Sequence, residues 1–245
     1  MTDIKAFLGR GALAGAFGGV AAAIFQLLVT ERQIRKALAL EAARGTGAHE
    51  EMFSRGTQVI GGMAGAVLYG VLVGVLFGFT CAVLWRSLPA ISAFTRSVNV
   101  AAAGFVTWAL VPMLKYPANP PAVGNPDTIG QRTASYLVLM VASTILASLA
   151  WELWKNLTRR GFSGAKRFAP TVGGYLAAIT AVYVLLPSNP DAVDAPAALI
   201  WHFRVDALAG NALLWLVLGT TFGWLADRVV FRASREVADR ESLAV

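Results

Sequence analysis

The sequence predicts an all-α, polytopic membrane protein with about six transmembrane helices arranged as three helical hairpins. Hydrophobic residues make up 56% of the 245 residues and charged residues only 14%, against about 25% charged in an average soluble domain. A helix needs about 20 apolar residues to cross the hydrocarbon core with its own backbone groups bonded. The lipid bilayer is therefore the first predicted partner, because six stretches carry no Asp, Glu, Lys or Arg: residues 11–30, 56–85, 97–114, 133–151, 168–190 and 207–226.

We expect one integral membrane domain over residues 1–245, because no long polar insert separates the spans. The first span is not a signal peptide, since its apolar run is too long and residues 29–32 offer no small-residue cleavage site. Residues 31–44 interleave apolar and basic side chains, which predicts a helical continuation or an interfacial amphipathic turn. The lone Cys81 excludes a disulfide within one chain. The expected spans are residues 8–30, 58–84, 97–114, 133–153, 169–187 and 205–226.

The connections after spans one, three and five are the long or proline-rich ones, which predicts three successive hairpins. Residues 116–120 (YPANP) follow span three and residues 186–190 (LPSNP) follow span five. An arginine precedes each returning span, namely Arg55, Arg132 and Arg204. Repeated hairpins of equal orientation would explain this pattern. The alternative is that Pro-Asn turns and interfacial arginines are simply common at the ends of spans.

The distribution of charge predicts the orientation. With a cytoplasmic N-terminus and six spans, 13 of the 21 Lys and Arg residues lie inside and 8 outside, and the whole net charge of +7 falls on the inner face. This agrees with the positive-inside rule, although five basic residues in the first outer connection run against it. We therefore expect both termini in the cytoplasm. A basic inner face attracts anionic lipid headgroups, and nucleic acid is not an expected partner.

Glycines recur at four-residue steps inside several spans. On a helix this spacing places them along one face, where they let another backbone approach closely. Helix packing is the expected role, and the alternative is that these small faces line a narrow path or slide during gating. The glycines concerned are Gly11, Gly15, Gly19, Gly70, Gly74, Gly78, Gly219 and Gly223.

Polar residues near the outer ends of the spans form the candidate site. Both histidines fall on the predicted outer side close to carboxylates, and imidazole with carboxylate suits borderline divalent ions such as cobalt, nickel or zinc. Their spacing matches no established metal motif, and solvated loop side chains are the alternative. Charges expected at the outer mouth are Arg132, Arg204 and Asp206. The candidate metal ligands are His202, Asp191, Asp194, Asp127 and His49.

The sequence does not predict an enzyme. It contains no H-E-x-x-H motif, no G-x-S-x-G elbow and no Walker loop, and its cysteine has no histidine nearby in the sequence. A lipid-modifying membrane enzyme is an alternative that lacks a candidate nucleophile or base at the required depth.

The order of these features resembles the CbtA family of predicted cobalt transporter subunits. The resemblance covers nearly the whole chain and is most specific between Lys115 and Arg132. It implies a multi-pass protein of the plasma (inner) membrane that takes up cobalt, with a small histidine-rich partner subunit (CbtB) that captures the metal. The matching segments are residues 26–31 (QLLVTE), 110–117 (LVPMLKYP), 130–132 (GQR), 203–208 (FRVDAL) and 211–215 (NALLW).

The leading hypothesis is thus a permease or permease subunit for a divalent metal cation, with cobalt the first expected ion and nickel the second. No permanently bound cofactor is expected, and a homo-oligomer is left open. The alternative is a non-conducting membrane scaffold that assembles or stabilises another transporter. The glycine faces are compatible with either function.

Overall fold

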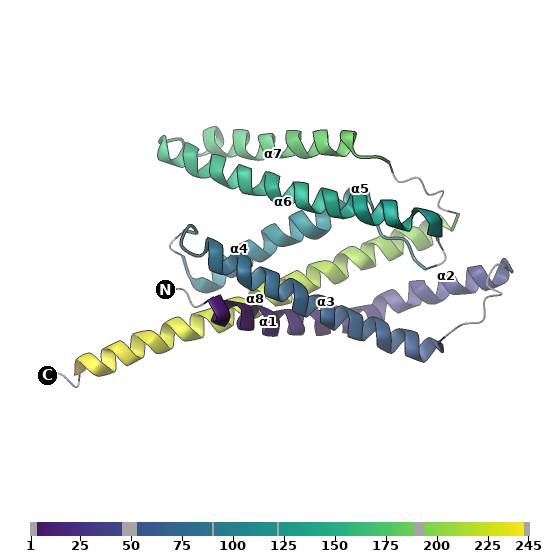
Figure 1. The fold of residues 1–245 in the computed structure, drawn as a ribbon, viewed down its shortest axis with the longest axis horizontal. Helices are drawn as coiled ribbons and strands as arrows, with labels where there is room; N and C mark the ends of the chain where they lie inside the picture. Colours follow the sequence, from purple (N-terminus) through teal and green to yellow (C-terminus); the bar gives the residue numbers. More distant parts are fainter. Residues whose placement is uncertain (1–3, 46–52, 90, 122, 189–193, 243–245) are drawn as a thin grey trace. The chain divides into compact units, whose positions relative to one another are not determined.

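The chain is built almost entirely of helices (Figure 1). The computed structural model describes residues 4–45, 53–89, 91–121, 123–188 and 194–242. Helices account for 85% of the structure, and the described residues contain no strand. The elements are α1 (Ile4–Phe25), η1 (Gln26–Thr30), α2 (Glu31–Ala43), α3 (Arg55–Leu84), α4 (Ala93–Phe105), η2 (Val106–Leu110), α5 (Val111–Lys115), η3 (Pro126–Thr128), α6 (Ile129–Arg159), α7 (Ala165–Leu185) and α8 (Ala197–Ser242).

Six helices in the described part of the chain are long and apolar enough to cross a membrane, which confirms the predicted fold class. The first runs without a break through α1, η1 and α2 for 40 residues. At 1.5 Å per residue it is about 60 Å long, twice the thickness of the hydrocarbon core. Of the two alternatives for residues 31–44, the structure has the helical continuation. The other five are Arg55–Leu84, Ala93–Lys115, Ile129–Arg159, Ala165–Leu185 and Ala197–Arg228.

Contacts divide the chain into two compact units. Unit 1 consists of Met1–Arg32, Ala48–Ala102 and Ala209–Val245, and unit 2 consists of Gln33–Gly47 and Ala103–Leu208. The predicted grouping of residues 1–245 into one membrane domain stays a prediction.

In unit 1, α1 and α3 pack backbone to backbone along their glycines. A Cβ atom added to Gly11 or Gly74 would overlap the carbonyl oxygen of the other residue, and Gly15 and Gly70 face each other in the same way. One turn further, a Cβ on Gly19 would lie 2.8 Å from the Ala66 carbonyl oxygen. Side chains of any size are excluded from this interface, so the two helices approach as closely as their main chains allow.

The glycines of α8 serve a similar close approach within unit 1. A Cβ on Gly219 would lie 2.5 Å from the Cβ of Ala101, and one on Gly223 would lie 2.8 Å from the Cα of Phe94. Beside this contact Phe222 is fully buried, with its ring 5.2 Å from that of Phe77. Within unit 1, α4 thus packs closely against the glycine-bearing part of α8.

In unit 2, α5, α6 and α7 pack around a small core of Val111, Tyr116, Leu139 and Ile179. Hydrogen bonds add to this packing, because the Trp108 indole N–H donates to Thr144 Oγ1 at 3.1 Å. In the α6–α7 pair, the Ser143 and Tyr175 hydroxyl oxygens lie 2.8 Å apart. The turn that joins α6 to α7 contains Gly161 and Gly164 with positive φ angles of 82° and 53°, a backbone region that favours glycine.

Within the described ranges, two π-helical turns interrupt the spans, one in each unit. Such turns usually accompany a displaced backbone hydrogen bond. In η2 the cause is visible, because Pro112 lacks the N–H that would bond the Trp108 carbonyl four residues earlier. The Tyr136 hydroxyl donates to that carbonyl at 3.1 Å, and the Tyr183 hydroxyl donates to the Val111 carbonyl. The Tyr136 hydroxyl thus supplies the bond that Pro112 cannot make, and the Tyr183 hydroxyl adds a bond at the start of α5.

Candidate functional site: charged ends of the membrane helices

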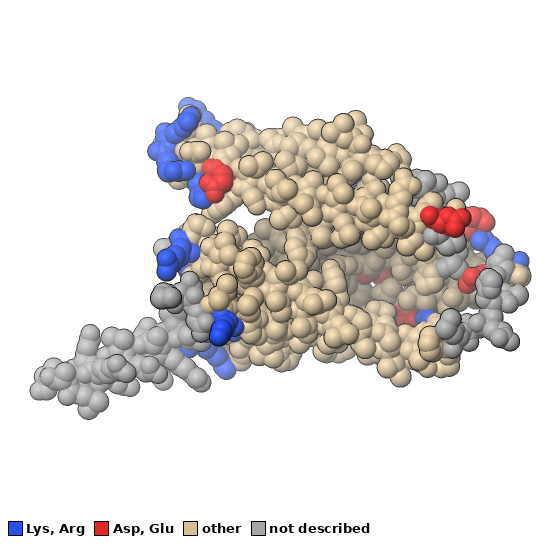
Figure 2. Space-filling model, in the orientation of Figure 1, with Lys and Arg blue, Asp and Glu red and all other residues tan. Residues whose placement is uncertain are grey.

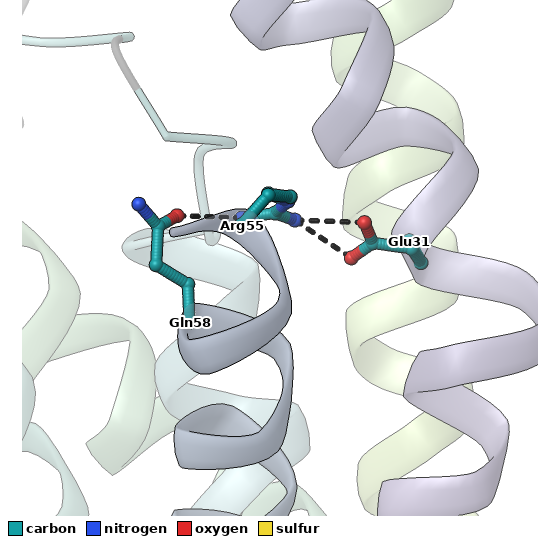
Figure 3. Close-up of polar contacts among 3 residues, drawn as sticks. All are labelled: Glu31, Arg55 and Gln58. Carbon is teal, nitrogen blue, oxygen red and sulfur yellow. Dashed lines mark hydrogen bonds and ion pairs between the residues drawn. The ribbon is translucent and has the colours of Figure 1, made fainter. Parts of the chain in front are cut away.

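One buried ion pair closes one end of the α1–α3 contact in unit 1. Arg55 Nη2 lies 2.9 and 2.7 Å from the two carboxylate oxygens of Glu31, and Arg55 Nη1 donates to Gln58 Oε1 at 2.9 Å (Figure 3). The Glu31 side chain is 5% exposed and that of Arg55 is 35% exposed. A carboxylate buried to this degree needs a cation or several donors beside it, and Arg55 supplies both.

The helix ends explain why this pair forms. Glu31 is the first residue of α2, directly after the π-helical turn, and its backbone N–H bonds the Gln26 carbonyl. Arg55 is the first residue of α3, whose N-cap Ser54 accepts a hydrogen bond from the Thr57 N–H. Both charges thus stand where an uncharged span ends, which is where interfacial charges are tolerated.

In unit 2, cationic side chains meet neutral oxygen atoms around the proline-rich loop that follows α5. Lys115 Nζ donates to the Tyr183 carbonyl at 2.8 Å and lies 5.4 Å from the centre of the Tyr116 ring. Arg204 Nη2 donates to Asn119 Oδ1 at 3.0 Å. The Tyr116 hydroxyl donates to the Pro187 carbonyl at 2.6 Å. These bonds fix the proline-rich loop after α5 to the end of α7 and to the first part of α8.

A cavity of about 390 Å³ lies at the start of α6, wholly within unit 2. Its polar lining consists of Arg132, Thr133, Tyr116 and Tyr136, and apolar residues complete the wall. Among the described residues, no acidic side chain lines it.

The predicted metal ligands are not brought together in the described part of the chain. Asp127 is exposed in η3 and His202 is exposed on α8. The Asp194 carboxylate pairs with Arg44 at 3.3 Å, with its side chain 90% exposed. The described residues contain no group of three His, Cys, Asp or Glu side chains that could hold a metal ion. His49 and Asp191 lie outside the described residues, so the five-residue metal site stays a prediction.

The predicted outer-mouth charges occupy different settings. Arg132 lines the cavity, and Arg204 bonds Asn119. Asp206 has one carboxylate oxygen, Oδ2, that is buried without a hydrogen-bond partner in the described structure.

The opposite ends of the helices are basic in each unit. Figure 2 shows Lys and Arg, in blue, gathered where α6 and α7 are joined, and this turn region contains Lys155, Arg159, Arg160, Lys166 and Arg167. In unit 1, Arg96 donates to the Pro89 carbonyl at 2.8 Å and lies 5.3 Å from the centre of the Trp85 ring. If all six helices cross the membrane, the α3–α4 and α6–α7 connections fall on the same side as the N-terminus.

Sequence reasoning missed Glu31 as a site residue. The available signal was its position, since Glu31 ends one uncharged stretch and Arg55 begins the next. Opposite charges at the two facing ends of a hairpin predict an ion pair. Asn119 was also missed, because one amide in a loop gives no indication of a partner 85 residues away.

A family comparison identifies the kind of protein that carries these features. The family model described as "Probable cobalt transporter subunit (CbtA)" matches residues 4–227. The chain belongs to the CbtA family. This confirms the resemblance expected from the sequence and makes the chain a transmembrane protein of cobalt transport. The match extends from the start of α1 to Asp227 and thus reaches all six membrane-length helices found among the described residues of this CbtA protein. No curated protein and no solved structure matches the chain significantly.

Proposed function

We propose that this CbtA protein is the membrane-embedded permease subunit of an uptake system for cobalt, with nickel as a second cation. The observation that carries the proposal is the family match across all six membrane-length helices. An integral subunit of six spans is the part of a transport system that can provide a route through the hydrocarbon core.

The orientation is part of the proposal. The basic ends of the helices face the cytoplasm of a cell bounded by a plasma (inner) membrane, because Lys and Arg are retained on that side. Both termini are then cytoplasmic. The Glu31–Arg55 pair and the proline-rich loop after α5 face the exterior, where the metal arrives.

Metal capture at the exterior is assigned to His202, Asp191, Asp194, Asp127 and His49, with help from a small histidine-rich subunit of the CbtB kind. Arg44 competes with the metal for Asp194. Arg132 and Arg204 add positive charge to the mouth, so a free cation needs either carboxylates from the loops or a partner that shields it.

A cation route along the α1–α3 interface requires a conformational change that separates the two helices. The glycine faces are in backbone contact, and the carboxylate of Glu31 is neutralised by Arg55. Glu31 is the one acidic side chain classed as buried among the described residues. We infer that opening of the Glu31–Arg55 pair accompanies passage of the cation, because only then is this carboxylate available to it.

Metal accumulation tests the proposal directly. Cells that lack other cobalt importers would express the chain with its partner subunit, and cobalt would be measured by elemental analysis at low external concentration. We expect accumulation above that of empty cells, and a large loss when Asp191, Asp194 and His202 are changed together to Asn, Asn and Ala. Glu152→Gln is the control, because its side chain is 58% exposed at the basic ends of the helices.

The scaffold function makes the opposite prediction. A scaffold would leave cobalt accumulation at the level of empty cells when its partner transporter is absent. Purified protein in vesicles would then also fail to pass cobalt. If the chain supports uptake but the triple variant is unaffected, the exterior ligand set is wrong while the permease function stands.

A further inference from the structure

The turn that joins α6 to α7 carries more positive charge than its own carboxylates neutralise. Residues 152–185, from the end of α6 to the end of α7, contain five Lys or Arg side chains and one acidic side chain, Glu152. The Glu152 carboxylate lies 2.6 Å from Lys155 Nζ, so these two charges cancel each other. The remaining four cations make no ion pair in the described part of the chain: Arg159, Arg160, Lys166 and Arg167.

Most of this charge is free of contacts within unit 2. Three of the four side chains are exposed and make no side-chain hydrogen bond to the residues that the structure describes, namely Arg159, Arg160 and Lys166. Arg167 is held in place, with its guanidinium carbon 4.0 Å from the centre of the Trp154 ring and its Nη1 donating to Thr158 Oγ1 at 3.1 Å. Neither of these neighbours is negatively charged, so the positive charge of the turn favours an anion from outside the chain.

The basic region of unit 1 does not share this property. Its α3–α4 connection and the start of α4 contain two arginines, Arg86 and Arg96. Arg96 donates to the Pro89 carbonyl at 2.8 Å and lies 5.3 Å from the centre of the Trp85 ring. Only Arg86 is left exposed there. Exposed positive charge is therefore concentrated at the α6–α7 turn rather than spread evenly over the basic helix ends.

The length of the uncharged helix places this turn at the level of the lipid headgroups. Residues 133–151 of α6 carry no charge, and at 1.5 Å per residue they extend over about 29 Å, close to the thickness of the hydrocarbon core. On α7 the uncharged stretch begins at residue 168, directly after Lys166 and Arg167. The rings of Phe162 and Phe168 are 41% and 57% exposed and add apolar surface beside the cations, as is typical of an interface between headgroups and acyl chains.

We infer that the α6–α7 turn is a binding surface for anionic phospholipids, with Arg159, Arg160 and Lys166 against the phosphate groups and Phe162 and Phe168 at the acyl-chain boundary. A guanidinium matches the oxygen atoms of phosphate with two parallel N–H bonds. The expected attraction of the basic face for anionic lipid is thereby assigned to one surface with named contacts. The inference concerns a ligand other than the transported metal and depends neither on transport nor on the side of the membrane that the turn faces.

The test uses the full chain purified in a neutral detergent. Its melting midpoint is followed against added phosphatidylglycerol, phosphatidylcholine or sodium phosphate at constant ionic strength, because a ligand of the folded state raises the midpoint by mass action. Wild type is compared with Arg160→Gln/Lys166→Gln, which removes one exposed cation from each side of the turn. The matched control is Arg32→Gln/Lys36→Gln, which removes two exposed cations from α2.

We expect the apparent affinity for phosphatidylglycerol to fall about fivefold for each cation removed from the turn, and thus about 25-fold in the turn variant. This result, with the control variant equal to wild type, supports the inference. It is overturned if wild type responds equally to phosphatidylglycerol and phosphatidylcholine, if the turn variant is unchanged, or if both variants lose the response equally. A response to sodium phosphate as large as that to phosphatidylglycerol overturns the assignment to lipid. Should the turn variant not fold, Arg159→Gln at an exposed position replaces it, and an unchanged affinity in that variant also overturns the inference.

Discussion

Replacing Gly74 with alanine tests the backbone contact between α1 and α3. The added Cβ would overlap the Gly11 carbonyl oxygen and lie 2.7 Å from the Cα of Gly15. Overpacking costs about 1–3 kcal/mol, and the upper end applies because both obstacles are main-chain atoms that cannot rotate away. Alanine also gains about 1 kcal/mol over glycine in a helix interior. The net expected loss is thus about 2 kcal/mol.

The same substitution at Gly65 is the matched control. Gly65 lies in α3 with no atom within 4 Å of an added Cβ, so only the helix-propensity gain of about 1 kcal/mol remains. The two variants should differ by about 3 kcal/mol. For a chain of this size that corresponds to about 6–12 °C between their melting midpoints, measured in one detergent by near-ultraviolet circular dichroism. Equal midpoints, or a more stable Gly74→Ala variant, would refute the packing argument.

Three further predictions concern single contacts. Glu31→Gln should lower the free energy of unfolding by about 2 kcal/mol, less than the 3–5 kcal/mol typical of a broken buried pair, because Arg55 is partly solvated. Asp194→Asn, in an exposed pair, should cost under about 1 kcal/mol. Similar melting midpoints for the two variants would contradict this difference. Tyr136→Phe should lower the free energy of unfolding by about 1–2 kcal/mol, because it removes the hydroxyl that donates to the Trp108 carbonyl. Adding Pro112→Ala to this variant should recover part of the loss by restoring a backbone N–H. If the double variant shows no recovery in thermal unfolding, the role assigned to the proline is wrong. A reporter fused to the C-terminus should be active only in its cytoplasmic form, and activity of an exported reporter would reverse the proposed orientation.

The six helices could be predicted from the sequence because the bilayer requires a minimum length of each span and excludes charged residues from it. Both constraints concern residues that are consecutive in the sequence. Arg55 was recognisable as a boundary residue for the same reason. Glycine spacing in α1 and α3 predicted a small face on each helix. It could not identify the partner, since any small face can accept any other, and the pairing of Gly11 with Gly74 depends on the arrangement of the chain in space.

The irregular turns and the polar contacts were beyond sequence reasoning. A π-helical turn shifts the register by one residue, and the uncharged residues 106–110 carry no periodic signal that would reveal such a shift. Proline at position 112 marks a disturbed helix but does not say which tyrosine will donate to the freed carbonyl. The Arg44–Asp194 pair joins residues 150 positions apart. Sequence reasoning had considered Asp194 only as a metal ligand.

The interlocked main chains of α1 and α3 have a mechanical consequence. Two rods that touch through carbonyl oxygens and Cα atoms, with no flexible side chains between them, can neither slide past each other by small steps nor tilt independently. They behave as one rigid helix pair. Any conformational change of the protein must therefore move α1 and α3 together as a rigid body or separate them completely, and gradual rearrangements have to take place in other helices.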